Sequence, residues 1–282
     1  MLYFQIDQRF LGCEDFIQGD VRVENERHIL LAAPLQKELL KTAKNWYLDG
    51  TFKIIRRPFE QLFSIHGFIQ KDDCMKQVPL LFVLMSRRRK RDYVAVFQKI
   101  RSLLPDLAVE GFVMDFERAT WSAVEEVFPD ARVQGCSFHW GQAVMRKLAT
   151  TQPLRQLFQY VEDTWINSDV WGIRQWSVFR LAVRTNNDVE GWHRRMIGKA
   201  GKAKLQFYVL VPLLLKEASQ LSIIMRLVDE QQLTRYQRVT SRRIHGTLHE
   251  LWAEYEERTI TTSLFLRRVG QVVAPAVPRP DE

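Results

Sequence analysis

The sequence predicts an α/β fold built on one mixed β-sheet, and three observations support this prediction. Three successive segments rich in aromatic and β-branched residues, joined by short links, predict antiparallel strands. Amphipathic segments then alternate with short apolar runs, as in parallel βαβ units. Hydrophobic residues make up 46% of the 282 residues, which is sufficient for a substantial core. The expected order is β-β-β-α-β-α-β-α, followed by further helices.

The antiparallel part is preceded by a helix. The segment "PLQKELLKTAKNW", which begins at Pro34, has its leucines near one helical face. Strands are then predicted at 46–55, 59–69 and 77–86. A turn and a short polar link separate these strands, so we expect them to pair as antiparallel neighbours.

The alternating part follows directly. Apolar residues at helical spacing predict helices at 91–104, 118–128 and 139–149. Short apolar runs between them predict strands at 109–115 and 131–138. A strand that follows such a helix returns parallel to the strand before it.

Beyond residue 150 the sequence predicts helices. They are expected at 154–166, from near Asn187, over about 205–232, and at 242–259. Pro212 either kinks the long helix or lies in its first turns. The most apolar run, Leu205 to Leu215, is too short to span a bilayer, so we assign it to the core and expect no membrane partner. The proline-rich tail is expected to be disordered.

The chain is accordingly divided into five parts. An N-terminal helical or extended segment precedes the first part of the core, and a shortened helical insertion precedes its completion, which carries the Glu190 helix and the long helix. A C-terminal helix and the tail come last. The predicted boundaries are 1–44, 45–150, 151–185, 186–232 and 233–282.

Charge and cysteine content limit the function classes. The chain has 41 Lys and Arg against 33 Asp and Glu, a net charge of +8, which favours a polyanion partner such as nucleic acid or indicates only a mildly basic surface. Its three cysteines, Cys13, Cys74 and Cys136, are odd in number and widely spaced, so we expect a reducing compartment and no disulfide framework. No signal peptide is visible.

Three acidic residues each have two interpretations, one structural and one chemical. Asp49 in "LDGTF" either ends a strand in an Asp-Gly turn or is a buried metal ligand. Asp115 closes the apolar run "GFVMD". Either Asp115 or a neighbour caps the helix that begins near Arg118, or Asp115 lies at the carboxyl end of a strand, where α/β sheets bind ligands.

Glu190, in "RTNNDVEGWHRR", is the third acid. Asn187 is a suitable N-cap, and Glu190 three residues later would complete a variant of the capping box. Glu190 could also pair with Arg194 at i,i+4. His193 lies on the same helical face as Glu190, and Asn187 and His193 are the expected supporting residues of any site there.

The segment "CSFH" brings Cys136 and His139 to a junction between a strand and a helix. A structural zinc site needs four ligands, and no second close pair is present, so zinc is not expected. A Cys-His nucleophile is not supported either, because nothing supplies an orienting acid.

Two basic runs are candidates for contacts with a DNA backbone; the alternative is a solvated loop. The residues concerned are Arg87, Arg88, Arg89, Lys90, Arg91, Arg194 and Arg195.

Four motifs, "YLDGTF", "MDFERA", "CSFHW" and "RTNNDVEGWHRR", occur in this order. Together they resemble the MULE (Mutator-like element) transposase domain of the DDE/RNase H-like group, over roughly 45–200. The resemblance implies an RNase H-like fold with an all-helical insertion, and a metal-binding triad of Asp49, Asp115 and Glu190. Cys136 and His139 would be the family's Cys-x-x-His element, which shapes the site or contacts DNA.

The implied activity is cleavage or transfer of DNA strands during transposition. Two Mg²⁺ or Mn²⁺ ions would clamp the attacking and leaving oxygens of a phosphodiester. DNA is the expected partner, a homo-oligomer is a further one, and the nucleus is the expected location.

Two departures from the family pattern raise an alternative. The sequence shows no zinc module ahead of Asp49, and the stretch between His139 and Glu190 is short, with 147–156 resembling a joint where helices are missing. A fragment, a splice form or a domesticated protein would explain both. The alternative is therefore a catalytically inactive DNA-binding or chromatin-associated protein on the same fold.

Overall fold

The computed structural model describes residues 4–13, 15–72, 74–150, 154–181, 183, 185–201, 203–232 and 239–273. The chain divides into two compact units. The first comprises Met1–Ser177 and Arg184–Thr234, and the second comprises Val178–Val183 and Arg235–Glu282. Each unit is described by itself below.

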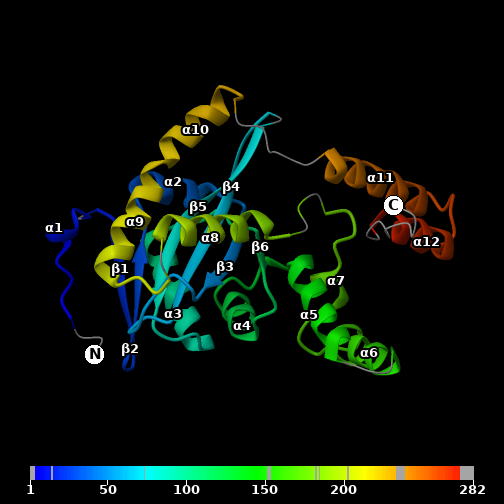
Figure 1. Cartoon of the computed structure of the whole chain (residues 1–282), viewed down its shortest axis with the longest axis horizontal. Coiled ribbons are helices and arrows are strands. Elements are labelled where there is room, and N and C mark those ends of the chain that lie inside the picture. Colours follow the sequence, from blue (N-terminus) through cyan, green and yellow to red (C-terminus); the bar gives the residue numbers. More distant parts are fainter. Residues whose placement is uncertain are drawn as a thin grey trace. The chain divides into compact units, whose positions relative to one another are not determined.

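The first unit is built on one seven-stranded mixed sheet in the order β1-β2-β5-β4-β3-β6-β7 (Figure 1). Strands β3, β4 and β5 pair antiparallel, and β6 and β7 join β3 in parallel. The predicted α/β class is confirmed, and the sheet is compatible with an RNase H-like fold. The strands are β1 Ile17–Val23, β2 Glu26–Leu31, β3 Asn45–Thr51, β4 Gln61–Lys71, β5 Cys74–Met85, β6 Gly111–Met114 and β7 Arg132–Gly135.

The hairpin β1–β2 was not predicted. It extends the sheet because β2 pairs antiparallel with β5. The first predicted core strand is also shorter than expected, since β3 ends at Thr51 rather than at residue 55. Ile54 and Ile55 are apolar because they are buried in the core, and not because they continue the strand.

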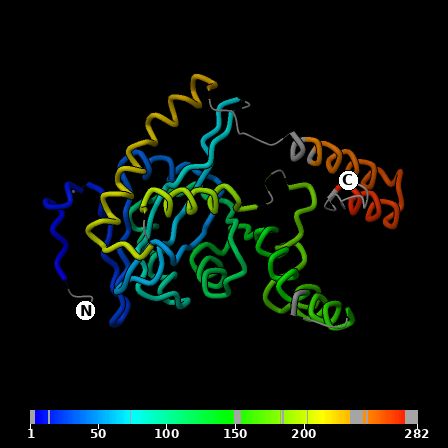
Figure 2. Tube along the Cα trace, viewed as in Figure 1, coloured from blue at the N-terminus to red at the C-terminus, as the bar shows by residue number. Residues whose placement is uncertain are grey.

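Helices cover both faces of the sheet. One face packs against α3 and α4, and the opposite face packs against α8 and α9 (Figure 2). Alternate residues of β5 therefore enter different cores: Val83 joins the first, and Phe82 and Leu84 join the second. The helices of this unit are α1 Gln8–Leu11, α2 Pro34–Thr42, α3 Lys90–Leu103, α4 Arg118–Val127, α5 Ser137–Thr150, α6 Leu154–Val161, η1 Glu162–Ile166, α7 Ile173–Trp176, α8 Asn187–Ala200, α9 Phe207–Ser219 and α10 Leu221–Asp229.

The long helix predicted over about 205–232 is two helices. Pro212 lies inside α9, whereas the break between α9 and α10 falls at Gln220. Among the described residues, Phe207–Asp229 is the one helical stretch whose length and composition would suffice to cross a membrane. Leu210 and Leu214 are buried in the second core of the sheet, so a membrane is not indicated.

The second unit is a helical hairpin of α11 Val239–Glu256 and α12 Thr262–Val273. Trp252 and Phe265 lie in its small core, and the Phe179 ring packs 5.6 Å from that of Trp252. The helix predicted at 242–259 corresponds to α11, while α12 was not predicted. The tail expected to be disordered lies almost wholly outside the described residues.

Candidate metal centre

The register of two parallel strands brings Asp49 and Asp115 together. Tyr47 pairs with Val113, and each acid lies two residues further along its own chain. Asp49 is inside β3, opposite Ser64 of β4, and is only 6% exposed. The interpretation of Asp49 as part of a turn that ends the strand is therefore wrong.

His139 lies beside these two acids. It is in the first turn of α5, which begins directly after β7, the next strand of the sheet. One ligand atom each of Asp49, Asp115 and His139 lie within 4.8 Å of one another, the arrangement of a potential metal site. Asp115 is not the N-cap of α4, because Glu117 occupies that position. The sequence had placed His139 near the site without a role as a ligand.

Glu190 reaches the same group from helix α8. Its Oε1 lies 3.2 Å from Nε2 of His139, and its Oε2 lies 3.9 Å from the Arg194 guanidinium. The predicted i,i+4 pair with Arg194 is thus present. Glu190 is in the first turn of α8, where the helix dipole stabilises a carboxylate.

The N-cap position of α8 is Asn186 and not, as predicted, Asn187. Asn186 is fully buried: its side chain donates to the backbone oxygen of Leu48 at 2.8 Å, and its N–H donates to the Cys136 sulfur at 3.1 Å. These bonds fix the start of α8 against β3 and against the junction that carries His139. Cys136 therefore has a positioning contact, whereas Asn187 is exposed.

A chain of buried polar side chains lies behind Asp49. Nδ1 of His193 is 3.2 Å from Oδ2 of Asp49, and Nε2 of His193 is 3.2 Å from the Ser64 hydroxyl. That hydroxyl is 3.0 Å from Nε2 of His66. The sequence offered a signal for Ser64 and His66 that the predictions missed. These two polar residues lie two positions apart in the otherwise apolar stretch 62–69, and so face the same side of the strand.

Hydrogen-bond chemistry sets the direction of the bond between His193 and Asp49. An ionised Asp49 carboxylate only accepts, so Nδ1 of His193 must donate. Nε2 of His193 and Nε2 of His66 both contact the Ser64 hydroxyl, whose single hydrogen can also be donated to the backbone oxygen of Asp49 at 3.4 Å. Burial lowers the pKa of His66 well below its usual value, which keeps this imidazole neutral. These contacts hold the His193 ring in place beside Asp49.

The pKa values at the centre reflect burial first and neighbouring charges second. Burial, followed by the Asp49 carboxylate, raises the pKa of Asp115 to about 6. Burial also raises the pKa of Glu190, although His139 opposes the shift. Burial lowers the pKa of His139, but Cys136 and Asp115 outweigh it and raise that pKa to about 9. The His139 imidazolium thus partly balances the acids around it.

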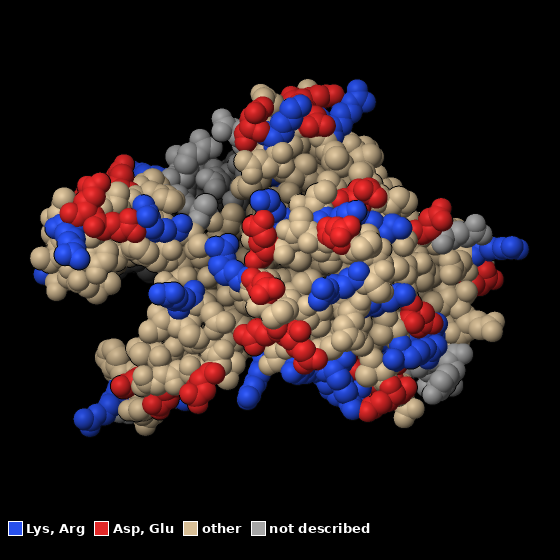
Figure 3. Space-filling view, turned by 180° about the vertical axis from the view of Figure 1, so that it is seen from behind, with Lys and Arg blue, Asp and Glu red and all other residues tan. Residues whose placement is uncertain are grey.

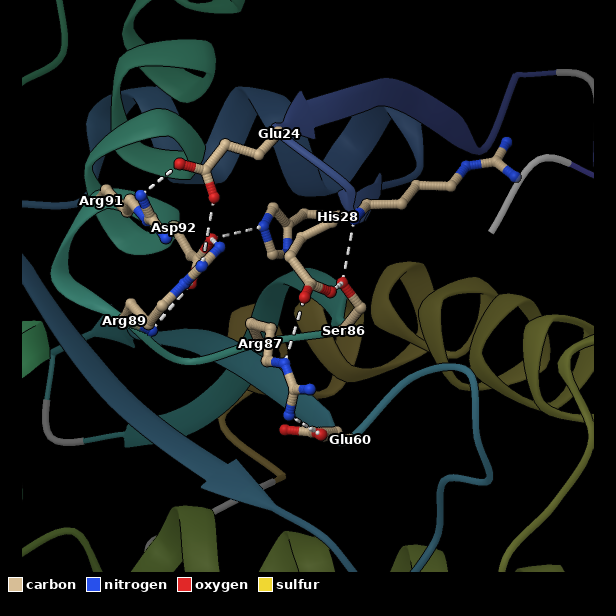
Figure 4. Close-up of polar contacts among 10 residues, drawn as sticks. Glu24, His28, Glu60, Ser86, Arg87, Arg89, Arg91 and Asp92 are labelled. Carbon is tan, nitrogen blue, oxygen red and sulfur yellow. Dashed lines mark hydrogen bonds and ion pairs between the residues drawn. The ribbon is translucent and has the colours of Figure 1, made fainter. Parts of the chain in front are cut away.

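The first basic run, Arg87 to Arg91, is paired with acids of the same unit (Figure 4). Arg87 contacts Glu60, and Arg89 bonds Asp92 at 2.9 Å, which also lies 3.3 Å from His28 in the core. The remaining partners are Glu117 for Arg88, Glu126 for Lys90 and Glu24 for Arg91. These cations therefore stabilise the strand–helix junction as well as being candidates for DNA contact.

The second basic pair is divided between two environments. Arg195 bonds the buried Glu217 of α9 at 2.7 Å, whereas the Arg194 side chain is 80% exposed beside Glu190. Figure 3 shows basic and acidic side chains interspersed over one face of the molecule. Of the predicted DNA contacts, Arg194 combines the greatest exposure with direct proximity to the centre.

A comparison with known families agrees with this geometry. Residues 45–143 match the MULE transposase domain. The match supports a transposase-like family and spans Asp49, Asp115 and His139 of the centre. Glu190 lies beyond the matched MULE segment, so its inclusion rests on its contact with His139. A comparison with curated proteins gave no match.

The donor set of this centre fits a hard divalent cation. Carboxylate oxygens of Asp49 and Asp115 converge from adjacent strands, and Mg²⁺ and Mn²⁺ prefer such oxygens. Bound cations would lower the raised pKa of Asp115, because positive charge favours the ionised carboxylate. Asp49, Asp115 and Glu190 would hold the ions, with His139 as a nitrogen donor or a charged neighbour.

Proposed function

We propose that this chain is a DNA transposase domain that cleaves or joins strands by phosphodiester chemistry with two divalent ions. The observation that carries the proposal is the convergence of Asp49, Asp115 and His139 within 4.8 Å, in contact with Glu190 through His139. Bound Mg²⁺ or Mn²⁺ would stabilise the attacking and leaving oxygens of the phosphodiester. DNA as the partner and a nuclear location are part of the proposal.

The protein's own residues have distinct tasks in this proposal. Asp49 is held by His193, so its carboxylate is oriented before substrate binds. Asp115 and Glu190 are further ligands, and both lie beside His139. His139 lies beside both acids, where it would act as a nitrogen ligand or, when protonated, donate a hydrogen bond to a phosphate oxygen. Arg194 would contact the neighbouring backbone.

Nicking of supercoiled plasmid tests the proposal. The wild-type protein should relax the plasmid in Mn²⁺ or Mg²⁺ and not in EDTA, and Asp115→Asn should reduce nicking to the EDTA level. Asp130→Asn is the matched control, because Asp130 is an exposed acid outside the centre. Its nicking rate should equal that of the wild type.

Titration with Mn²⁺ separates the two candidate functions. The enzyme requires saturable binding that Asp115→Asn weakens. Absence of nicking with either metal, together with unchanged Mn²⁺ binding in Asp115→Asn, would sink the enzymatic proposal. DNA binding that persists under those conditions would then favour the inactive DNA-binding alternative.

A further inference from the structure

A cavity of about 490 Å³ adjoins the metal centre. Asp115 and His139 belong both to the potential metal site and to the lining of this cavity. The volume lies within the range of small-molecule sites, roughly 300–1,000 Å³. A chemical group attached to a phosphate at the metal centre therefore has a space of suitable size beside it.

The lining of the cavity combines aromatic rings with cationic side chains. Phe52, in the loop after β3, is 49% exposed, and the Arg88 guanidinium lies 4.5 Å from the centre of its ring. Arg146 and Tyr160 contribute from α5 and α6. Aromatic rings and guanidinium planes are the surfaces on which unpaired nucleobases stack.

Two tryptophans of the lining, Trp165 and Trp171, form a stacked pair. Trp165 is 2% exposed, and its ring stacks on Trp171 with centres 5.6 Å apart. The buried Nε1 of each indole has no hydrogen-bond partner within the described part of the chain. The two stacked indoles therefore add an aromatic wall to the cavity, while their Nε1 atoms are buried away from it.

We propose that this cavity binds one unstacked nucleobase of the DNA strand, adjacent to the phosphodiester at the metal centre. The inference rests on the proposed function. In a duplex each base is stacked on both faces, so only an extruded or single-stranded base can present its face to Phe52. Stacking on Phe52 and Arg88 would offset the free energy of unstacking.

Binding of a fluorescent single-stranded oligonucleotide, followed by anisotropy in EDTA, tests this site without requiring metal. Phe52→Ala should raise the Kd about tenfold, given the usual contribution of one base–aromatic stack. Phe52→Trp should restore wild-type affinity or improve on it. Phe10→Ala, which removes a 75% exposed ring of α1, is the matched control and should leave the Kd unchanged.

Photocrosslinking locates the base directly. An oligonucleotide with a single 5-iododeoxyuridine should crosslink to peptides that contain Phe52, Tyr160 or Trp171. An unchanged Kd in Phe52→Ala, crosslinks confined to other segments, or no single-strand binding by the wild type would each overturn the proposal. Equal competition by free thymidine monophosphate would overturn it too, because the site would then be one for small nucleotides.

The two proposals fail in different ways. If Asp115→Asn abolishes nicking while Phe52→Ala leaves oligonucleotide affinity unchanged, the proposed function stands and the base site falls. If no metal supports nicking but affinity and crosslinks depend on Phe52, the base site stands and the proposed reaction falls.

Discussion

Two carboxylates of the sheet unit, Glu217 and Asp115, have opposite surroundings. Glu217 accepts hydrogen bonds from the Trp192 indole at 2.9 Å, Arg195 at 2.7 Å and Lys199 at 2.6 Å. Burial alone would raise its pKa, but the bonds from Lys199 and Arg195 lower it below its usual value. Glu217 therefore joins α8 to α9 and stabilises the fold in its ionised form.

Glu217 contacts cations, whereas a near neighbour of Asp115 is another carboxylate, that of Asp49. Burial and that neighbour raise the pKa of Asp115 to about 6. The ionised form of Asp115 therefore reduces the stability of the metal-free protein. The contrast shows how an acid that serves the fold differs from one arranged for a ligand. Cations of the chain outweigh the cost of burying Glu217, whereas His139 balances the charge at Asp115 only in part.

The largest expected effect is loss of the Glu217 contacts. Glu217→Gln should lower the free energy of unfolding by about 2–4 kcal/mol at pH 7, somewhat below the range for fully buried pairs because Arg195 and Lys199 can turn toward solvent. The folded pKa is lowered, so this contribution is present above the unfolded pKa and is lost as pH falls through the folded one. Urea denaturation between pH 3 and pH 7 measures it.

An exposed ion pair provides the control for Glu217. Arg226 and Glu230 lie 2.9 Å apart on α10, with side chains 80% and 43% exposed. Glu230→Gln should change the unfolding free energy by no more than about 0.5 kcal/mol. Equal losses in the two variants would show that Glu217 is not the structural acid described above.

The second prediction is a gain in the free energy of unfolding rather than a loss. Asp115→Asn should stabilise the metal-free protein by on the order of 2 kcal/mol at pH 7. Because the folded pKa of Asp115 is raised, its stability cost develops as pH rises toward and through about 6, so the gain in Asp115→Asn should vanish near pH 4. Denaturation in EDTA at both pH values measures this. A destabilised Asp115→Asn protein at pH 7 would contradict the described crowding of charges.

A smaller effect is expected for Ser64, which contacts the His193 ring beside Asp49. Ser64→Ala breaks the chain from His66 to His193, so Asp49 loses its oriented partner. Affinity for Mn²⁺ should fall about tenfold, the lower end of the range for groups that position metal ligands. Calorimetric titration measures it, with the exposed Ser219→Ala as the control. Unchanged affinity would mean that Asp49 is oriented without this chain.

The smallest predicted effect concerns the salt dependence of DNA binding, and it distinguishes Arg194 from Lys90. Arg194→Gln should reduce the slope of log K against log salt for duplex DNA by about one, because an exposed cation next to the centre neutralises a phosphate. Lys90→Gln should change the slope less, since Lys90 already pairs with Glu126 at 2.7 Å. The reverse order would make the run from Arg87 to Arg91 the principal DNA contact.

The sequence predicted most of the core of the fold. Strands and helices from residue 45 to residue 150 fall in the predicted order, because alternating or helical spacing of apolar residues reflects which side of each element is buried. The hairpin β1–β2 was missed, since pairing along the edge of β5 leaves little local signal. The break at Gln220 was missed because Pro212 is the stronger local indicator of a bend.

The sequence by itself determined the kinds of residue at the centre: Asp49 within an inner strand, Asp115 directly after another, and Glu190 at the start of a late helix. The tertiary structure decided how they meet. His139 becomes a neighbour of all three acids, Asn186 rather than Asn187 occupies the start of α8, and the first basic run is paired with acids. Such contacts join segments far apart in the chain, as with Asn186 and Leu48, 138 residues apart. Local spacing encodes which face of an element is buried, whereas the partner on that face is set only when the elements pack.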